Sequence, residues 1–380
     1  MYLRMLLTTA IGVAGASALA QTAPQEPPAK PFTVASHDGT PIHGQADLPA
    51  GTPRVAVVMS AGTGLFDRDV RFGKTGTPED LLFKELGKRF VARGLAAVRY
   101  DRRGVNWGKT GDERLDKPVS GSSTVDSQRE DLAAVYAWAK AKAGLGAKCV
   151  ILFGHSEGTL HISRLAASGA PAPLAVIGMG AAAASPMETI RWQMMERDAF
   201  SLTAMDTDHD GLTTQAEVEA HWRETPSSFA NLLDPLLPPD RVAWTRAQIE
   251  SVHTVQKAMY EKARADALAL DDAAPYPNAQ TPMAKSSWWK SWFTDGAVTA
   301  QLLGRWAGVP VYYHWGTTDS QTPPALQELI ARRWLGDRAT LIVHPGLGHS
   351  LGKDPLFGPM DPAAADQIAD EAAAAARKCR

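Results

Sequence analysis

A serine flanked by glycines is the residue of this chain best suited to act as a nucleophile. Residues 154–158 read Gly-His-Ser-Glu-Gly, follow an apolar run at 149–153 and open a helix-like stretch that begins at Glu157. Strand, sharp turn and helix in this order form a nucleophile elbow, which holds the serine strained and exposed. Glycines permit so tight a turn because they lack a Cβ atom. We therefore predict that Ser156 is a catalytic nucleophile; an ordinary glycine-bounded turn is the alternative.

A serine nucleophile needs a base, and the base needs an orienting acid. The functional loops of a parallel sheet follow the carboxyl ends of its strands. Asp319 comes just after an expected strand, and His349 lies in a glycine-flanked loop after the last one. The order Ser156, Asp319, His349 is that of one large hydrolase class. Two alternatives remain open: Asp319 could begin the next helix, and His344 competes as the base, although its place at a strand end favours a packed or capping role.

An oxyanion hole needs two backbone N–H groups near the nucleophile. One is expected from Glu157, where the start of the helix adds a positive field. The other is expected from the glycine-rich loop 60–64, with Thr63 as the first candidate and Gly62 as the second. Glycines in this loop would let the backbone approach a substrate carbonyl closely. A plain glycine turn is the alternative.

Strand and helix patterns alternate along most of the chain, which predicts βαβ units and a parallel sheet. The expected strands are 32–36, 42–48, 55–59, 95–100, 149–153, 174–179, 309–315 and 339–343, and the expected helices are 80–93, 125–142, 157–167, 324–334 and 362–378. The pattern breaks at 185–296, where no strand is predicted. We interpret this segment as a helical cap inserted after the sixth strand into a core formed by 32–184 and 297–380.

The beginning of the chain predicts export. A positive segment ends at Arg4, an apolar stretch follows, and Ala-Leu-Ala at 18–20 fits a signal-peptidase site, so 1–20 is expected to be removed and 21–31 to be a flexible leader. The apolar stretch is too short for a membrane anchor. We expect a periplasmic or secreted protein with no membrane span in its mature form. Because the net charge is −2 and the chain has no basic cluster, we expect no nucleic-acid partner.

The two cysteines, Cys149 and Cys379, could form a disulfide, because export makes this bond chemically permissible. Cys149 begins the strand that leads to the elbow and should lie at the edge of the sheet opposite the active site. The last helix should run back toward that same edge and bring Cys379 there. A frayed carboxyl terminus is the alternative.

Residues 206–217 read Asp-Thr-Asp-His-Asp-Gly-Leu-Thr-Thr-Gln-Ala-Glu, and this spacing matches a calcium-binding loop of the EF-hand type. The expected ligands are the carboxylates of Asp206, Asp208, Asp210 and Glu217, the carbonyl of Leu212, and the hydroxyl of Thr214 or a water. Gly211 would permit the sharp turn. We predict a structural Ca²⁺ in the cap; a solvated acidic turn is the alternative. No second loop to pair with this one is evident in the sequence.

Tryptophans gather where the insertion should return to the sheet. Trp288, Trp289 and Trp292 are expected near the mouth of the active site, where they could line a pocket for an acyl or aryl group. A helical cap also needs an apolar core of its own, so packing is the alternative for each of them.

Charged residues cluster at 67–69 and at 101–102, in loops expected to follow neighbouring strands. An arginine of these loops could meet an anionic substrate. We favour an ion-pair network that fixes the two loops in place.

Four motifs of the chain resemble those of one known family. They are 62–69 (GTGLFDRD), 100–104 (YDRRG), 287–293 (SWWKSWF) and 316–323 (GTTDSQTP). In these the chain resembles α/β-hydrolases of the secreted bacterial esterase and serine-aminopeptidase-like (S33-type) branch, from residue 31 onward apart from the insertion. Leu65 and Ala61 depart from the proline and histidine of that branch. The resemblance implies an α/β-hydrolase fold with a mostly parallel sheet and an inserted cap.

Together these features predict a serine hydrolase that cleaves small-molecule carboxylic esters through an acyl-enzyme and needs no cofactor for the chemistry. The same triad could serve a peptidase of aminopeptidase type. A calcium-dependent binding protein on an inactive hydrolase scaffold is a third reading, which the complete set of Ser156, Asp319 and His349 disfavours.

Overall fold

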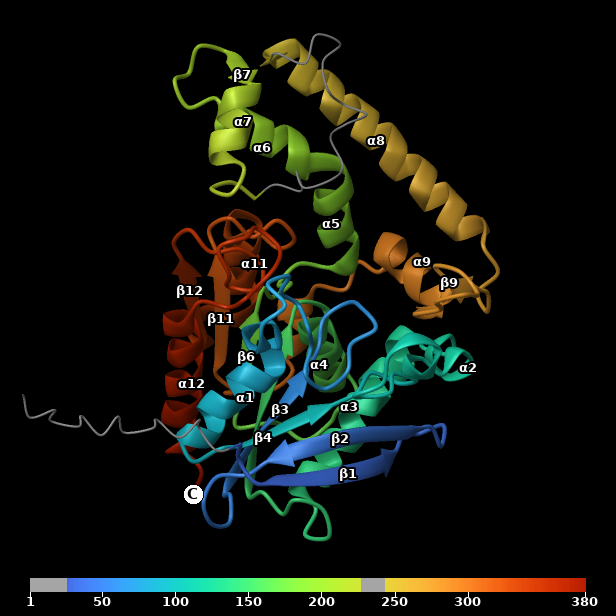
Figure 1. Cartoon of the computed structure of the whole chain (residues 1–380), viewed down its shortest axis with the longest axis vertical. Coiled ribbons are helices and arrows are strands. Elements are labelled where there is room, and N and C mark those ends of the chain that lie inside the picture. Colours follow the sequence, from blue (N-terminus) through green and yellow to red (C-terminus); the bar gives the residue numbers. More distant parts are fainter. Residues whose placement is uncertain (1–25, 227–242) are drawn as a thin grey trace, which may run out of the picture.

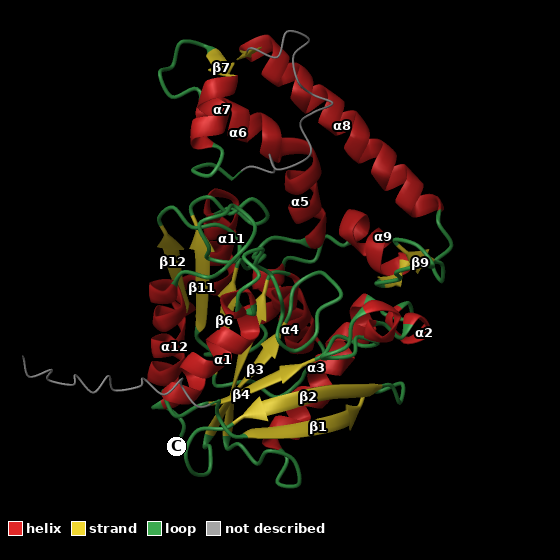
Figure 2. Ribbon diagram, viewed as in Figure 1, coloured by secondary structure: helices red, strands yellow, loops and turns green. Residues whose placement is uncertain are grey.

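An eight-stranded sheet lies at the centre of the computed structural model, which describes residues 26–226 and 243–380. The strand order is β1-β2-β4-β3-β5-β6-β11-β12; β2 pairs antiparallel with both its neighbours, and the other pairs are parallel (Figures 1 and 2). The strands are β1 Ala29–Ala35, β2 Pro41–Asp47, β3 Val55–Ser60, β4 Ala96–Tyr100, β5 Cys149–His155, β6 Ala175–Met179, β11 Val311–Gly316 and β12 Ala339–His344. Each corresponds to a strand expected from the apolar pattern. The predicted signal segment 1–20 and the start of the leader lie outside the described residues.

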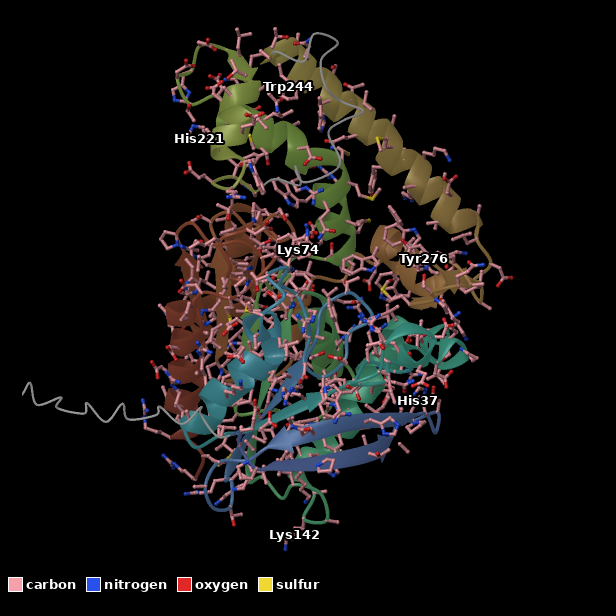
Figure 3. The ribbon with its side chains drawn as sticks, viewed as in Figure 1. His37, Lys74, Lys142, His221, Trp244 and Tyr276 are labelled. Atoms are coloured by element: carbon pink, nitrogen blue, oxygen red, sulfur yellow. A yellow bond between two sulfur atoms is a disulfide. The ribbon has the colours of Figure 1, made fainter. Side chains whose placement is uncertain are left out.

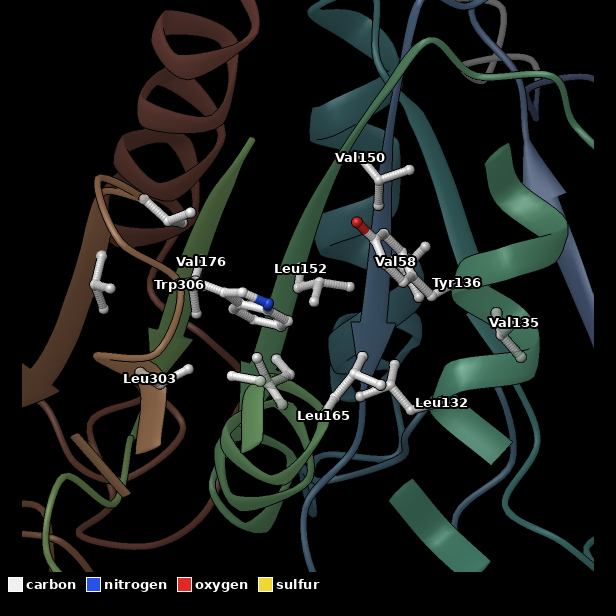
Figure 4. Close-up of a cluster of buried hydrophobic side chains, with 14 of the residues drawn as sticks. Val58, Leu132, Val135, Tyr136, Val150, Leu152, Leu165, Val176, Leu303 and Trp306 are labelled. Carbon is white, nitrogen blue, oxygen red and sulfur yellow. The ribbon is translucent and has the colours of Figure 1, made fainter. Parts of the chain in front are cut away.

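Helices cover both faces of the sheet. Apolar side chains of α1 (Leu82–Ala92) and α12 (Pro362–Ala376) pack on one face. The other face is covered by α3 (Val125–Lys140), α4 (Glu157–Ala167), α10 (Thr299–Leu303) and α11 (Pro324–Leu335), in a cluster that Figure 4 shows in part. Short helices in the connections are η1 Pro78–Asp80, η2 Gly111–Arg114, α2 Lys117–Ser120 and η5 Gly336–Arg338. Burial of both faces explains why the central strands read as continuous apolar runs.

The insertion between β6 and α10 lies beyond the carboxyl ends of the parallel strands (Figure 1). Its elements are α5 Pro186–Arg191, the π-helical turn η3 Trp192–Glu196, α6 Arg197–Met205, β7 Leu212–Thr214, α7 Gln215–His221, β8 Ala243–Thr245, α8 Arg246–Ala269, β9 Pro275–Tyr276, β10 Ala284–Lys285 and α9 Ser286–Thr294. The insertion is mostly helical, as expected. The expectation that it holds no strand is wrong, because β7 pairs with β8 and β9 with β10. Strands this short carry too few residues for an apolar alternation to be read.

A disulfide joins Cys149 to Cys379, with their Cα atoms 6.0 Å apart. Cys149 is the first residue of β5, and Cys379 follows α12, which packs along the sheet toward the amino end of that strand. Arg54, which precedes β3, adds a hydrogen bond of 3.1 Å from its Nη2 to the carbonyl of Cys379. The carboxyl terminus is therefore fixed to the strand that carries the elbow.

None of the helices in the described part of the chain is long and apolar enough to cross a membrane.

Replacement of both cysteines by serine should lower the unfolding temperature, because the disulfide closes a long loop and restricts the unfolded chain. The chain-entropy contribution is at most about 5 kcal/mol. Thermal unfolding of the wild type with and without reductant, beside the double variant without reductant, measures the effect. Equal unfolding temperatures for all three samples would contradict a stabilising disulfide.

Candidate active site

The turn between β5 and α4 holds Ser156 in a strained conformation. Its φ is 53°, in a region that residues other than glycine seldom adopt. The flanking glycines are needed for close packing: a Cβ on Gly158 would lie 2.1 Å from the carbonyl oxygen of Ser60, and one on Gly154 would lie 2.8 Å from the nitrogen of Thr159. The local sequence therefore forms the sharp strand-to-helix turn that its pattern predicts.

His349 and Asp319 form a buried acid–base pair. The Nδ1 atom of His349 lies 2.9 and 3.0 Å from the two carboxylate oxygens of Asp319. Asp319 also accepts hydrogen bonds from the backbone nitrogens of Gln321 and Thr322 and from the Thr322 hydroxyl. Burial alone would raise the pKa of Asp319, but His349 and these donors lower it. The ionised carboxylate can only accept, so Nδ1 carries the proton and Nε2 is left to act as a base.

The competing histidine, His344, lies elsewhere. Its Nε2 is 3.1 Å from Nδ1 of His314, whose Nε2 is 2.8 Å from Oε2 of Glu371. Burial and the neighbouring His314 lower the pKa of His344 to about 4. His344 is thus part of a buried polar chain and is not paired with the acid of the candidate triad.

Ser156 and His349 line one cavity of about 320 Å³. The loop residues Gly62 and Thr63 line it as well, and a Cβ on Gly62 would lie only 3.0 Å from Cβ of Ser156. Glu157, at the start of α4, lines the same cavity. The structure thus brings the nucleophile, the base and both segments expected to supply oxyanion donors to one place.

Aromatic side chains form much of the remaining wall. Trp288, Trp289 and Trp292 of α9 line the cavity and also pack in the apolar core of the cap. Several further residues line the cavity without having been predicted from the sequence: Phe72, Thr189, Ile190, Gln193, Leu356 and Phe357. Phe72 and Phe357 lie in loops with their ring centroids 5.5 Å apart. The signal in the sequence that could have identified these two residues was their position shortly after Asp69 and shortly after His349.

The side chain of Glu157 connects three parts of the site. It is 3 % exposed. Its Oε1 accepts a hydrogen bond of 2.6 Å from the Trp288 indole, and its Oε2 accepts one of 3.0 Å from the Thr63 hydroxyl. Both terminal nitrogens of Arg102 lie 3.3 Å from the same Oε2. The carboxylate therefore joins the cap helix α9, the candidate oxyanion loop and the loop after β4.

Arg102 extends these contacts to the backbone. Its Nη1 donates to the carbonyl of Gly62 at 2.8 Å and to that of Gly64 at 3.2 Å. Burial alone would raise the pKa of Glu157, but Arg102, the neighbouring His161 and the hydrogen bond from Trp288 hold that pKa well below its usual value. The expected ion-pair network of the charged loops is present, and it includes the Arg68–Asp101 pair. Arg102 pairs with Glu157, a residue that the sequence had suggested only as a backbone donor.

His155, next to the nucleophile, is also buried. Its ring centroid lies 5.1 Å from that of His349 and 5.3 Å from that of Phe72. Burial and the nearby His349 lower the pKa of His155 well below its usual value. His155 is therefore a neutral part of the cavity wall at pH 7.

The expected metal ligands lie at the far end of the cap, away from the cavity. Asp206, Asp208 and Asp210 place carboxylate oxygens within 4.8 Å of one another. Glu217 is not in this group; its carboxylate accepts hydrogen bonds from Thr207, which lies between Asp206 and Asp208, and from Thr214. Leu212 and Thr214 belong to β7, which lies within the segment 206–217 and follows the three aspartates. The structure thus groups three of the six expected ligands.

Comparison with known proteins identifies the family. The model of the family described as alpha/beta hydrolase fold matches residues 78–354. The chain belongs to the α/β-hydrolase fold family. A comparison with curated proteins found no match.

Solved structures similar to this α/β-hydrolase agree on the fold. A carboxyl esterase from Bacillus coagulans in complex with glycerol has a TM-score of 0.53 and 13 % identity, over 92 % of this chain and 98 % of its own. A lipase in an open form has a TM-score of 0.52 and 14 % identity, over 93 % and 99 %. DcsB in complex with its substrate analogue has a TM-score of 0.51 and 14 % identity, over 92 % and 99 %. At such low identity these similarities show the fold alone.

Replacement of Glu157 by Gln should destabilise this α/β-hydrolase and slow any turnover at Ser156. Loss of the charge leaves Arg102 buried and unpaired, which costs about 3–5 kcal/mol of unfolding free energy, and it loosens the loop that carries Gly62 and Thr63. Urea unfolding and kcat measure the two effects. Asp47→Asn is the matched control, since Asp47 is buried in a 2.7 Å ion pair with Arg99 away from the cavity and should affect stability alone.

The stabilisation by Glu157 should also depend on pH. Because its pKa is lower in the folded protein than its usual value of 4.5, its contribution is complete above that value and is lost as pH falls through the lower, folded value. The difference in unfolding free energy between wild type and Glu157→Gln should therefore stay constant at neutral pH and narrow below about pH 4.5. Urea unfolding at a series of pH values tests this, and a difference that grows in acid would contradict it.

Proposed function

We propose that this α/β-hydrolase is an exported serine carboxylester hydrolase acting on small-molecule esters. The proposal rests on one observation above all. Ser156, in a strained elbow, and His349, oriented by the buried Asp319, line the same largely apolar cavity. This is the arrangement that acyl transfer to a serine requires.

The proposed reaction follows from these positions. Oγ of Ser156 attacks the ester carbonyl carbon while Nε2 of His349 takes the hydroxyl proton. The backbone N–H groups of Glu157 and of Thr63 or Gly62 stabilise the oxyanion. The bond to the alcohol oxygen then breaks, and His349 returns the proton to that oxygen. Water repeats these steps on the acyl-enzyme and releases the acid, while Asp319 keeps its charge throughout.

The charges around the cavity favour a neutral ester over the amine of a peptide. An aminopeptidase needs an anionic group for the substrate's ammonium. Among the described residues that line the cavity, Glu157 is the one with a carboxylate. Its oxygens already accept hydrogen bonds from Trp288, Thr63 and Arg102. A volume of about 320 Å³ is at the lower end of the range for ligand sites, which suits short acyl or aryl esters.

Export to the periplasm or the medium is part of this proposal. Two features support it: the signal-like sequence of residues 1–20 and the Cys149–Cys379 disulfide, a bond that persists mainly in oxidising compartments.

Ser156→Ala and His349→Ala should each reduce the hydrolysis of p-nitrophenyl esters by about 10⁶-fold in kcat, because nucleophile and base act as a unit. Asp319→Asn should cost less, about 10⁴-fold. Steady-state kinetics measures these losses. His344→Gln is the matched control for the base and should keep most of the activity; if it lost the activity while His349→Ala kept it, the assignment of the base would be wrong.

Labelling with a serine-directed fluorophosphonate tests whether the scaffold is active at all. The wild type should be labelled and Ser156→Ala should not. No label at Ser156 in the folded wild type would instead support a binding protein built on an inactive scaffold.

Substrate preference provides a separate test. We expect short-chain and aryl p-nitrophenyl esters to be cleaved with a kcat/KM far above that for aminoacyl p-nitroanilides, since the cavity offers no unpartnered carboxylate to an ammonium group among the residues that the structure describes. Measurement of both substrate series on one preparation makes the comparison. A preference for the anilides would favour the peptidase of aminopeptidase type.

A further inference from the structure

We propose that the tip of the cap is a two-part cation-binding unit. In this unit the loop 206–217 binds one divalent cation of the calcium type. The segment that runs from β8 into α8 is the structural partner of this loop and supplies no ligand. Arg246 of this segment competes with the ion for Asp206. None of the unit's described residues lines the cavity that holds Ser156.

The loop itself has the chemistry for such an ion. Asp206, Asp208 and Asp210 gather carboxylate oxygens within 4.8 Å, and Gly211 adopts the left-handed turn with a φ of 90°. Asp206 is 1 % exposed, and its Oδ1 is buried with no hydrogen-bond partner among the described residues. A buried carboxylate oxygen without a donor is costly unless a cation satisfies it. Carboxylate oxygens are hard ligands of the kind that Ca²⁺ prefers.

The partner segment is visible only in the structure. β7 pairs antiparallel with β8, with Thr213 opposite Trp244 at the centre and one pair of residues on either side. Each strand leads directly into a helix with the same capping box, Thr214 with Glu217 before α7 and Thr245 with Gln248 before α8. The two strand–helix segments are therefore related by an approximate two-fold axis between Thr213 and Trp244. Figure 2 shows β7 beside the start of α8.

The second half lacks the ligands of the first. At the position of Glu217 it has the neutral Gln248. At the sequence positions before Thr245 that correspond to those of Asp206, Asp208 and Asp210 before Thr214, the chain has Leu237, Pro239 and Arg241. These three residues lie outside the described part of the chain, and none has a carboxylate. One ion per chain is therefore expected.

Arg246, the first residue of α8, connects the halves electrostatically. Its Nη2 lies 2.6 Å from Oδ2 of Asp206, and its side chain is half exposed. The guanidinium thus offsets part of the charge of the aspartate cluster. An arriving cation must share Asp206 with Arg246 or displace it, so Arg246 should weaken the affinity for the ion.

Apolar packing makes the unit rigid and joins it to the rest of the cap. Trp244, labelled in Figure 3, is buried with Leu202 and Met205 of α6, Val218 of α7, and Ile249 and Val252 of α8. Through η3 and α6 the same unit reaches the catalytic acid loop: Gln193 donates to the carbonyl of Gln321, and Arg197 to that of Ser320, next to Asp319. An ion at the tip would therefore stabilise the helix that rests on this loop.

Titration of CaCl₂ into the metal-stripped mature protein by isothermal calorimetry tests the proposal. We expect one site with a dissociation constant of about 10⁻³ M or tighter, a weaker response to Mg²⁺, and a higher unfolding temperature with Ca²⁺ than with chelator. Asp208→Asn and Glu217→Gln should each weaken binding by more than about tenfold. Arg246→Gln should bind several-fold more tightly than the wild type. Asp266→Asn, which removes an exposed carboxylate of α8 outside the loop, is the matched control and should bind as the wild type does.

Each other outcome would overturn a stated part of the proposal. No heat and no shift of the unfolding temperature at millimolar Ca²⁺ would exclude the site. Binding of two ions per chain would contradict the inference that the segment from β8 into α8 supplies no ligand. Tighter binding of Mg²⁺ than of Ca²⁺ would exclude a calcium-type site. Binding that is unchanged in Asp208→Asn would place the ion elsewhere, and unchanged affinity in Arg246→Gln would exclude the competition.

Discussion

The arrangement of the candidate site depends on how the buried carboxylate of Glu157 is compensated by its hydrogen-bond donors. A charge inside the protein must be compensated by donors that are held in place, and here these donors come from three separate segments of the chain. Thr63 belongs to the loop after β3, Arg102 to the loop after β4, and Trp288 to the cap. The requirement to neutralise one charge therefore sets the relative positions of the nucleophile, the oxyanion loop and the cavity wall. A hydrophobic residue at this position could fill the space but could not orient all three.

The candidate triad could be predicted because each member follows a strand that can be recognised locally. Apolar runs at β5, β11 and β12 identify the strands, and a parallel sheet places the loops that follow them at one edge. The order of strands and helices in the core could be predicted for the same reason, and the structure confirms it. The side-chain role of Glu157 could not be predicted, since it depends on partners distant in sequence. Sequence spacing shows that Glu157 begins a helix, but not that an arginine and a tryptophan meet it there.

The cap shows the opposite balance. Its composition predicts helices, yet the features that organise it are contacts between short segments. β7 and β8 have three residues each, too few to show an alternating pattern, and the segment from β8 into α8 carries no sequence motif of its own. The same limit applies to Phe72 and Phe357, which line the cavity from loops. Local sequence thus determines the elements of the cap, whereas tertiary contacts determine how they pair.

The covalent link between Cys149 and Cys379 determines what a cut by a protease would do to this chain. The bond connects the strand before the elbow to the end of the chain, and the whole cap lies between the two joined residues. A single cut anywhere in the cap would therefore leave two polypeptides that remain one molecule. Both fragments would also keep their places in the central sheet, with Ser156 on one and His349 on the other. A clipped form could accordingly persist as a two-chain protein that separates only when it is reduced.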